Sequence, residues 1–266
     1  MDPNSQPAAG GAFPLTRRSL VVAVGSGDRE VRRSAFGALV EAYWKPVYKL
    51  LRLRWRLSPV EAEDATQEFF ARALEKDWFA RYDPGRARFR TYLRTCLDGH
   101  AANLAKAARR GKRGGGAVPL SLDFAAAEGE VARLEPAAAP DAEELFYREW
   151  VRGLFAIAVE RLRHRMEASG RTLRFEIFAA HELDEGAGGA AGDDAQRPTY
   201  AALAARFGVA ATKVTNELAA ARRELRRIVL ELLREVTGSE REFRDEARAL
   251  LGIEVEAERP AVGEGG

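Results

Sequence analysis

Residues 199–225 read TYAALAARFGVAATKVTNELAAARREL, which has the outline of two helices around a glycine turn. Thr199 stands where a helix N-cap belongs, and Gly208 falls where a helix leaves through a left-handed turn. The second helix places a narrow apolar stripe at three- and four-residue spacing, made of Ala211, Val214, Leu218, Ala221 and Leu225. The pattern predicts a helix-turn-helix, whose second helix enters the major groove of DNA. The alternative is an ordinary helical hairpin in a core.

The face opposite this stripe is the candidate DNA-reading surface. It carries Thr212, Asn216, Ala219, Arg223 and Arg227, with Lys213 at its flank. Asparagine suits adenine, whereas arginine suits guanine or a phosphate. Base contacts come mostly from the N-terminal part of a recognition helix, so Lys213 and Asn216 rank first. The later arginines favour phosphates.

The composition narrows the possible functions. The 266 residues suggest one large or two small domains, and a hydrophobic fraction of 46% is ample for real cores. The formal net charge is only +2, but the charges are segregated along the chain. Residues 86–113 hold nine Lys or Arg against one acid, and residues 114–146 hold seven acids against one Arg. Such segregation suits a chain that lays one face on nucleic acid.

Cysteine and histidine usage predicts neither a metal site nor a cofactor. Cys96 is the single cysteine, which excludes an internal disulfide, and the three histidines stand far apart. Cys96 falls in the middle of an amphipathic helix, which favours a buried structural thiol over a catalytic nucleophile. We therefore expect no enzyme. Neither a signal peptide nor a membrane span is evident in the sequence, so we expect a cytoplasmic protein.

Helix and loop signals divide the chain into two all-α domains. Ser58-Pro59-Val60-Glu61 combines a cap, a proline at the first helical position and an acid at the third, so it predicts a helix start. Pro46 interrupts a helical repeat that begins near residue 28, so we expect two helices or a kink there. Glycines, prolines and acids between residues 111 and 140 indicate a flexible linker.

The predicted domains are a loose tail over 1–27, a first domain over 28–112, a linker over 113–141, a second domain over 142–237 and a C-terminal extension over 238–266. Helices are expected over 60–76, 88–110, 142–168 and 172–183, then in the helix-turn-helix to about 236, with a last amphipathic piece over 243–251.

Two helices of the first domain carry chemically distinctive faces. Asp64, Gln67 and Glu68 fall on one narrow arc of the helix over 60–76, an acidic stripe that by itself is most often a solvated face. The helix over 88–110 interleaves cations with aromatic residues, namely Arg88, Phe89, Arg90, Tyr92, Arg94, Lys106, Arg109 and Arg110. Cations bind phosphates and aromatic faces stack on unpaired bases, so this pattern favours single-stranded or melted DNA. Phe89 and Leu93 are expected in the core.

These motifs in this order resemble a bacterial RNA polymerase sigma factor. The stretches are DATQEFF (64–70), FRTYL (89–93) and the helix-turn-helix, over about residues 28–124 and 142–251. The two-domain form is similar to the extracytoplasmic-function (ECF) group, in particular to its longer planctomycete-type members. Those share stretches like AYWKPVYKLLR (42–52), GRARFRTYLRTCL (85–97) and PLSLDF (119–124).

The resemblance implies a role for each part. Asp64, Gln67 and Glu68 would bind the clamp coiled coil of core RNA polymerase. The residues implied in melting the −10 element and capturing its flipped bases are Arg88, Arg90, Tyr92, Asn103, Lys106, Arg109 and Arg110. The linker would thread toward the polymerase active-site cleft, where its acids could mimic nucleic-acid charge. The second domain would sit on the polymerase flap and read the −35 element of promoter DNA. An anti-sigma protein or a kinase stays open as a further partner.

The chain departs from the family pattern at three positions. Tyr92 stands where tryptophan is common, and Ala210 replaces the usual serine cap of the recognition helix, a loss of about 1 kcal/mol. Glu217 stands where a basic residue is frequent and would repel phosphate. A stand-alone dimeric helix-turn-helix regulator is the alternative function, but it leaves the acidic stripe unexplained.

Overall fold

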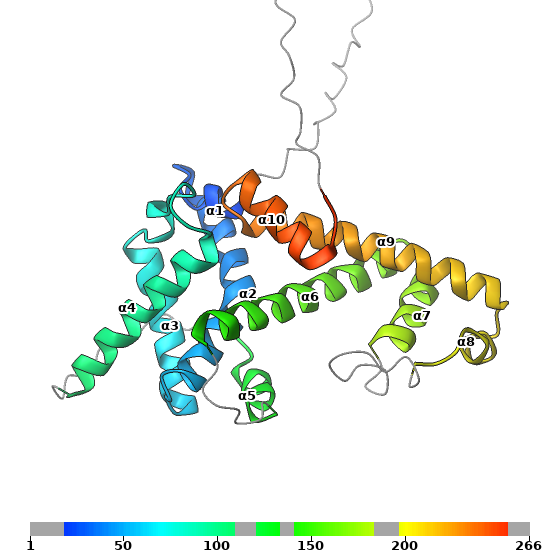
Figure 1. Cartoon of the computed structure of the whole chain (residues 1–266), viewed down its shortest axis with the longest axis horizontal. Coiled ribbons are helices and arrows are strands. Elements are labelled where there is room, and N and C mark those ends of the chain that lie inside the picture. The colour runs from blue at the N-terminus through cyan, green and yellow to red at the C-terminus, as the bar shows by residue number, and fades with distance from the viewer. Residues whose placement is uncertain (1–18, 110–120, 134–140, 184–196, 255–266) are drawn as a thin grey trace, which may run out of the picture.

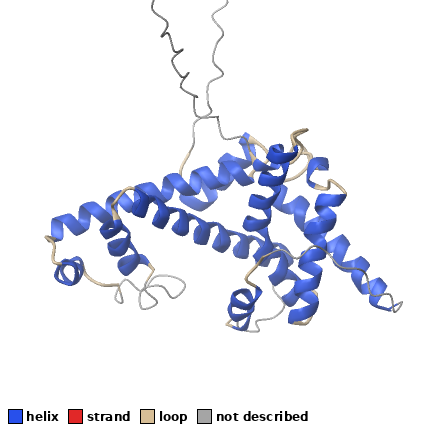
Figure 2. Ribbon diagram, turned by 180° about the vertical axis from the view of Figure 1, so that it is seen from behind, coloured by secondary structure: helices blue, strands red, loops and turns tan. Residues whose placement is uncertain are grey.

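The computed structural model describes residues 19–109, 121–133, 141–183 and 197–254, and every regular element in these ranges is helical (Figures 1 and 2). The predicted all-α class is therefore confirmed. The helices are α1 (Leu20–Ala23), α2 (Arg29–Leu53), α3 (Pro59–Glu75), the short 3-10 helix η1 (Phe79–Arg81), α4 (Phe89–Arg109), α5 (Phe124–Ala132), α6 (Ala142–Ala168), α7 (Thr172–Glu182), α8 (Tyr200–Phe207), α9 (Ala211–Val236) and α10 (Glu240–Leu251). No helix in these ranges has the length and apolar character that crossing a membrane requires.

Local capping signals start the helices where the sequence predicts. The Ser58 hydroxyl accepts the backbone N–H of Glu61 at 3.3 Å, and the Glu61 carboxylate accepts the backbone N–H of Ser58 at 2.9 Å. Thr199 caps α8 by accepting the N–H of Ala202 at 3.2 Å. Gly208 ends α8 at φ 65°, the left-handed conformation that glycine adopts without steric cost.

Of the two alternatives predicted at Pro46, two separate helices is wrong, because α2 continues through Pro46 as one helix of 25 residues. A proline inside a helix removes one hydrogen bond. α2 lies at the centre of the N-terminal half, where α1, α3, α5 and α6 all pack against it. Tyr43 and Val47, on either side of Pro46, are almost fully buried. Tertiary packing thus outweighs the local cost.

The prediction of a linker without structure over residues 113–141 is wrong in its middle, where α5 forms and packs against α2. Phe124 is buried, and the acids of α5 face the cations of α2. Glu128 pairs with Arg52 at 2.5 Å, while Glu130 pairs with Lys49 at 2.6 Å. The Arg52 guanidinium holds the pKa of Glu128 below its usual value. These acids are therefore neutralised within the fold; residues 113–120 and 134–140 of the predicted linker lie outside the described residues.

The predicted loose tail over residues 1–27 also contains structure at its end. Val21 and Val24 are buried where α1 packs against α2 and α9. The Ser19 hydroxyl donates to the backbone carbonyl of Thr237. Residues 1–18 lie outside the described residues. The apolar run in α1 therefore joins the core, because it covers surface that α2 and α9 alone would expose.

α6 and α10 connect the N-terminal helices with the C-terminal helices (Figure 1). α6 packs against α2 and against α9. Its Phe146 and Trp150 stack on Tyr43 of α2, with ring centroids 6.5 and 6.3 Å apart. Beside these rings, Lys49 and Glu149 form an ion pair at 2.5 Å. α10 turns back from the end of α9 and reaches the start of α4.

Candidate nucleic-acid interface

The acidic stripe lies on the outer face of α3. Asp64 is exposed, while Gln67 and Glu68 are half-buried. Glu68 pairs with Arg72 one turn further along the helix, at 2.5 Å. The opposite face of α3 is apolar and buries Phe69 and Phe70 in the core. The helix therefore presents the three residues together at the surface.

The residues predicted to act on the −10 element divide between two sides of α4. Tyr92 and Asn103 face a pocket beside α3, whereas Arg88 and Arg90 face α10 and α6. Arg90 is only 14% exposed, and its guanidinium lies 4.5 Å from the centroid of the Tyr147 ring. Lys106 is exposed. Arg109 ends α4 but its side chain lies outside the described residues, as does the whole of Arg110.

The pocket beside Tyr92 has a volume of about 280 Å3 and lies between α3, η1 and α4. Its walls combine aromatic rings, cations and hydrogen-bonding side chains, namely Arg72, Lys76, Trp78, Arg81, Tyr92, Thr95, Cys96, His100 and Asn103. The Tyr92 hydroxyl donates to the backbone carbonyl of Trp78 at 2.7 Å. Burial raises the pKa of Tyr92 to about 12, so the phenol keeps this proton at neutral pH.

Trp78, Arg81 and His100 are among the side chains of the pocket that were not predicted to contact DNA. Trp78 and Arg81 could have been predicted, because the mixture of aromatic and basic residues that marks α4 already begins at residue 78, upstream of that helix. His100 escapes sequence analysis because only the tertiary fold buries it, to 3% exposure against the rings of Phe69 and Trp78. Its Nε2 has no hydrogen-bond partner among the described residues. Burial lowers the pKa of His100, so the ring is neutral at pH 7.

Cys96 lines the same pocket and is half-buried rather than fully buried. Burial raises the pKa of its thiol. The nucleophilic form of cysteine is the thiolate, so this environment opposes nucleophilic catalysis. In the part of the chain that the structure describes, His, Cys, Asp and Glu side chains form no group that could hold a metal ion.

α8 and α9 are joined by three residues, and the start of α9 projects into solvent. Val214, Leu218 and Ala221 of the predicted stripe are buried, whereas Ala211 is exposed and Leu225 half-buried. The predicted reading residues lie on the outer side: Thr212, Lys213, Asn216, Arg223 and Arg227 are exposed and Ala219 is half-buried. Arg227 pairs with Glu224 at 2.6 Å, and that bond raises the pKa of the guanidinium.

Glu217 is neutralised by a residue that sequence analysis did not connect with it. Arg174 of α7 holds its carboxylate at 2.5 Å, and both side chains are about four-fifths buried. Beside this pair, a basic groove of about 450 Å3 runs between the α6–α7 turn and α9. Five arginines line it: Arg165, Arg171, Arg174, Arg223 and Arg227. The repulsion expected from Glu217 is thus offset by neighbouring positive charge.

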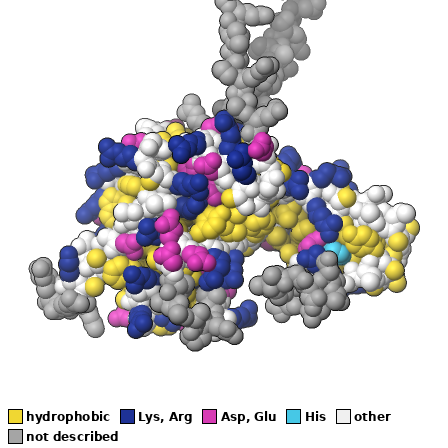
Figure 3. Space-filling view, viewed as in Figure 1, with side chains coloured by type: hydrophobic (Ala, Val, Ile, Leu, Met, Phe, Trp, Pro, Cys, Tyr) yellow, Lys and Arg dark blue, Asp and Glu magenta, His cyan; other side chains and the backbone are white. Residues whose placement is uncertain are grey.

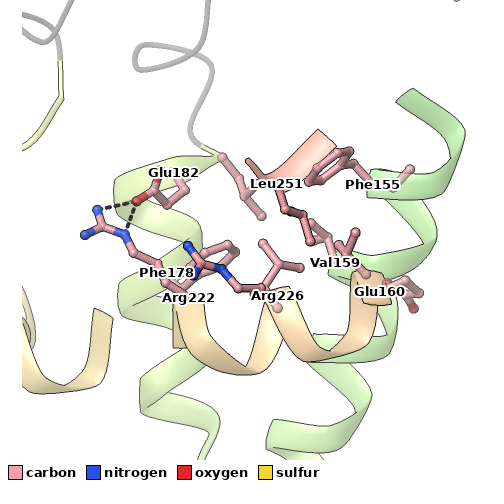
Figure 4. A pocket seen from close by; sticks show the side chains of 12 residues that line it. Phe155, Val159, Glu160, Phe178, Glu182, Arg222, Arg226 and Leu251 are labelled. Atoms are coloured by element: carbon pink, nitrogen blue, oxygen red, sulfur yellow. Dashed lines mark hydrogen bonds and ion pairs between the residues drawn. The ribbon is translucent and has the colours of Figure 1, made fainter. Parts of the chain in front are cut away.

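An apolar groove of about 700 Å3 lies between α6, α7, α9 and the end of α10 (Figure 4). Phe155, Val159 and Leu251 converge on it, and Arg222 closes one end through an ion pair with Glu182 at 2.5 Å. Figure 3 shows apolar side chains gathered along the middle of one face of the molecule. Exposed apolar area of this kind is typical of a protein-binding site.

Residues 39–111 match the family model for sigma-70 region 2. The matched range runs from the middle of α2 through α4 and contains both the acidic stripe and the pocket. No curated protein and no solved structure matches the chain. Region 2 is a DNA-binding regulatory module without enzymatic activity. Residues 39–111 are therefore similar to region 2 of sigma-70 factors, a similarity that supports a role in transcription initiation with RNA polymerase and promoter DNA.

Proposed function

We propose that this chain is a sigma factor of the ECF group, similar to the longer planctomycete-type members, which directs core RNA polymerase to specific promoters. The region 2 match carries the proposal, because the matched residues 39–111 include both the acidic stripe and the residues that line the aromatic pocket. The first domain, residues 28–112, binds the polymerase and melts the −10 element. The second, residues 142–237, reads the −35 element with α8 and α9 as a helix-turn-helix.

The pocket between α3 and α4 is the receptor for a base that has left the duplex. Trp78 and Tyr92 offer aromatic faces for stacking, and the exposed Asn103 offers hydrogen bonds. Flipping a base costs a few kcal/mol of lost stacking, which these contacts offset. The cations that border the pocket and can hold the adjoining phosphates are Arg72, Lys76 and Arg81.

The exposed start of α9 enters the major groove at the −35 element. Asn216 is free to form hydrogen bonds with a base edge, and Lys213 flanks it. The arginines of the groove beside α9 extend this surface toward the α6–α7 turn, so Arg171 joins Arg223 as a phosphate contact. The apolar groove between α6, α7 and α9 receives the polymerase flap.

Binding to core polymerase tests this function directly. We expect the purified chain to form a stoichiometric complex with core RNA polymerase on size-exclusion chromatography. Asp64→Arg reverses the charge at one position of the stripe that is proposed to meet the clamp. We expect at least tenfold weaker binding to core, since like-charge contacts across an interface cost several kcal/mol. Glu144→Arg makes the same charge change at an exposed site on α6 and serves as the control.

The outcome that contradicts the proposal is a chain that forms no complex with core. A homodimer that binds DNA without polymerase would instead support the stand-alone regulator. Equal core affinities of Asp64→Arg and Glu144→Arg would remove the role of the stripe.

A further inference from the structure

A carboxylate of α10 caps the start of α4. Glu242 accepts the backbone N–H of Phe89, the first residue of α4, at 2.8 Å. Its second oxygen accepts the Tyr82 hydroxyl at 3.2 Å and the N–H of Gly238 at 2.9 Å. Glu242 is 5% exposed. An anion at this position is stabilised by the free N–H groups and the positive end of the helix dipole.

Two arginines beside this helix start are also engaged by α10. Arg88 lies 2.9 Å from Glu246 and 3.3 Å from Asp245, and Arg90 forms an ion pair with the same Glu246 oxygen. Glu246 is fully buried by these contacts. The start of α4 therefore presents one backbone N–H and two guanidinium groups to three carboxylates of a single helix.

This set of donors is the chemistry that binds phosphate. Helix N-termini accept phosphate through their free N–H groups, and arginine pairs with phosphate as it does with carboxylate. The region 2 match covers both arginines, and the resemblance to sigma factors implies that both contact the −10 element of promoter DNA. In the folded chain, the carboxylates of α10 occupy this set of donors.

α10 packs on the rest of the chain with few buried apolar side chains and many charged ones. Seven of its twelve residues are charged, and Phe243 and Ala247 are its two buried apolar residues. Glu246 buries a second oxygen, Oε2, that has no hydrogen-bond partner among the described residues. A buried charge with an unsatisfied oxygen carries a desolvation cost that its partners do not fully offset.

We propose that α10 is an internal competitor of promoter DNA, which forms ion pairs with Arg88 and Arg90 in the free chain and is displaced when DNA phosphates take its place. This inference rests on the proposed function, because it concerns access to the DNA site of the same domain. The end of α10 also contributes Leu251 to the apolar groove assigned to the flap. Polymerase binding at that groove and DNA binding at α4 would therefore both displace contacts of α10.

Charge removal on α10 tests the proposal. Asp245→Asn combined with Glu246→Gln keeps side-chain size but abolishes the ion pairs with both arginines. We expect the full-length double variant to bind a fluorescein-labelled, single-stranded, A/T-rich DNA oligonucleotide at least about fivefold more tightly than wild type, because a larger fraction of molecules exposes the site. The affinity should also depend more steeply on salt, since more arginines displace counterions from the DNA.

The matched control is Glu240→Gln combined with Glu254→Gln, which removes two acids of the same segment that pair with Arg244 and Arg248 instead. We expect this control to bind as wild type does. Equal affinities of the double variant and the control would overturn the role of α10. Failure of the proposed function would be seen in a different experiment, as the absence of any complex between the wild-type chain and core polymerase.

Hydrogen exchange on the wild-type protein gives a second test that needs no variant. In the complex of chain, core polymerase and promoter DNA, we expect the amides of α10 to exchange faster than in the free chain. Unchanged protection of α10 in a complex that has bound DNA would overturn the proposal.

Discussion

At the residue scale, the pocket between α3 and α4 shows how burial sets the chemistry of a side chain. His100 and Cys96 both line this pocket, and each has a side chain that can ionise. Burial lowers the pKa of His100 and raises that of Cys96, so each is held in its neutral form. Neutral groups suit a pocket for an uncharged base, where they offer hydrogen bonds without attracting counterions.

His100 should make stability depend on pH. Its pKa is lowered in the folded chain, so the unfolded chain binds the proton first as pH falls below about 6.5. We expect the free energy of unfolding to be smaller at pH 5.5 than at pH 7.5, as measured by urea denaturation. His100→Gln should reduce this difference, because the carboxylates with lowered pKa, such as Glu128, titrate at lower pH. An identical pH dependence in both proteins would contradict the assignment.

At the element scale, α8 and α9 show one helix with a cap and one without. Thr199 caps α8 by a side-chain hydrogen bond, whereas Ala210 stands at the N-cap of α9 with extended backbone and no side-chain bond. The backbone at Ala210 therefore has the conformation of an N-cap residue, but alanine has no side-chain acceptor for the free N–H groups of α9. This agrees with the departure from the family pattern that the sequence shows at this position.

Ala210→Ser should therefore stabilise the protein by about 1 kcal/mol, because serine can accept a free N–H of the first turn. The midpoint of urea denaturation measures this effect. Ala210→Gly is the control, since it lacks the hydroxyl and should differ from serine by a few tenths of a kcal/mol or more. If serine brings no gain over glycine, the first turn of α9 is satisfied by other means.

At the scale of the whole molecule, the α2–α6 interface ties the region 2 domain to the C-terminal helices. Its centre is polar: Lys49 is 2% exposed and Glu149 is 1% exposed, in an ion pair at 2.5 Å. Arg152 also holds Glu149, at 2.9 Å. The side chains of Lys49 and Glu149 are both almost completely buried, so water has little access to the pair.

Lys49→Met should destabilise the whole chain, because it leaves the buried Glu149 without its closest cation. We expect a loss of about 3 kcal/mol in the free energy of unfolding, measured by urea denaturation. Lys45→Met removes a neighbouring pair with Glu130 in which both side chains are about one-third exposed, and should cost less than about 1 kcal/mol. Equal losses of unfolding free energy in the two variants would show that burial does not make the Lys49–Glu149 pair more important to stability than the more exposed pair.

The sequence by itself determined the all-α class, the bounds of most helices and the candidate residues on each. These follow from interactions within one turn, such as the capping box at Ser58 and the left-handed Gly208, which a local pattern encodes fully. The apolar stripe of α9 was also predicted, apart from its exposed first residue.

The tertiary structure alone decided which of those residues meet. It carried α2 through Pro46, placed α5 on α2, paired Glu217 with Arg174 and covered Arg88 with Glu246. The last two pairs join positions 43 and 158 residues apart. Helical periodicity reports which face of one helix is apolar, but not which other helix covers it, because that choice depends on burial and charge pairing summed over the whole chain.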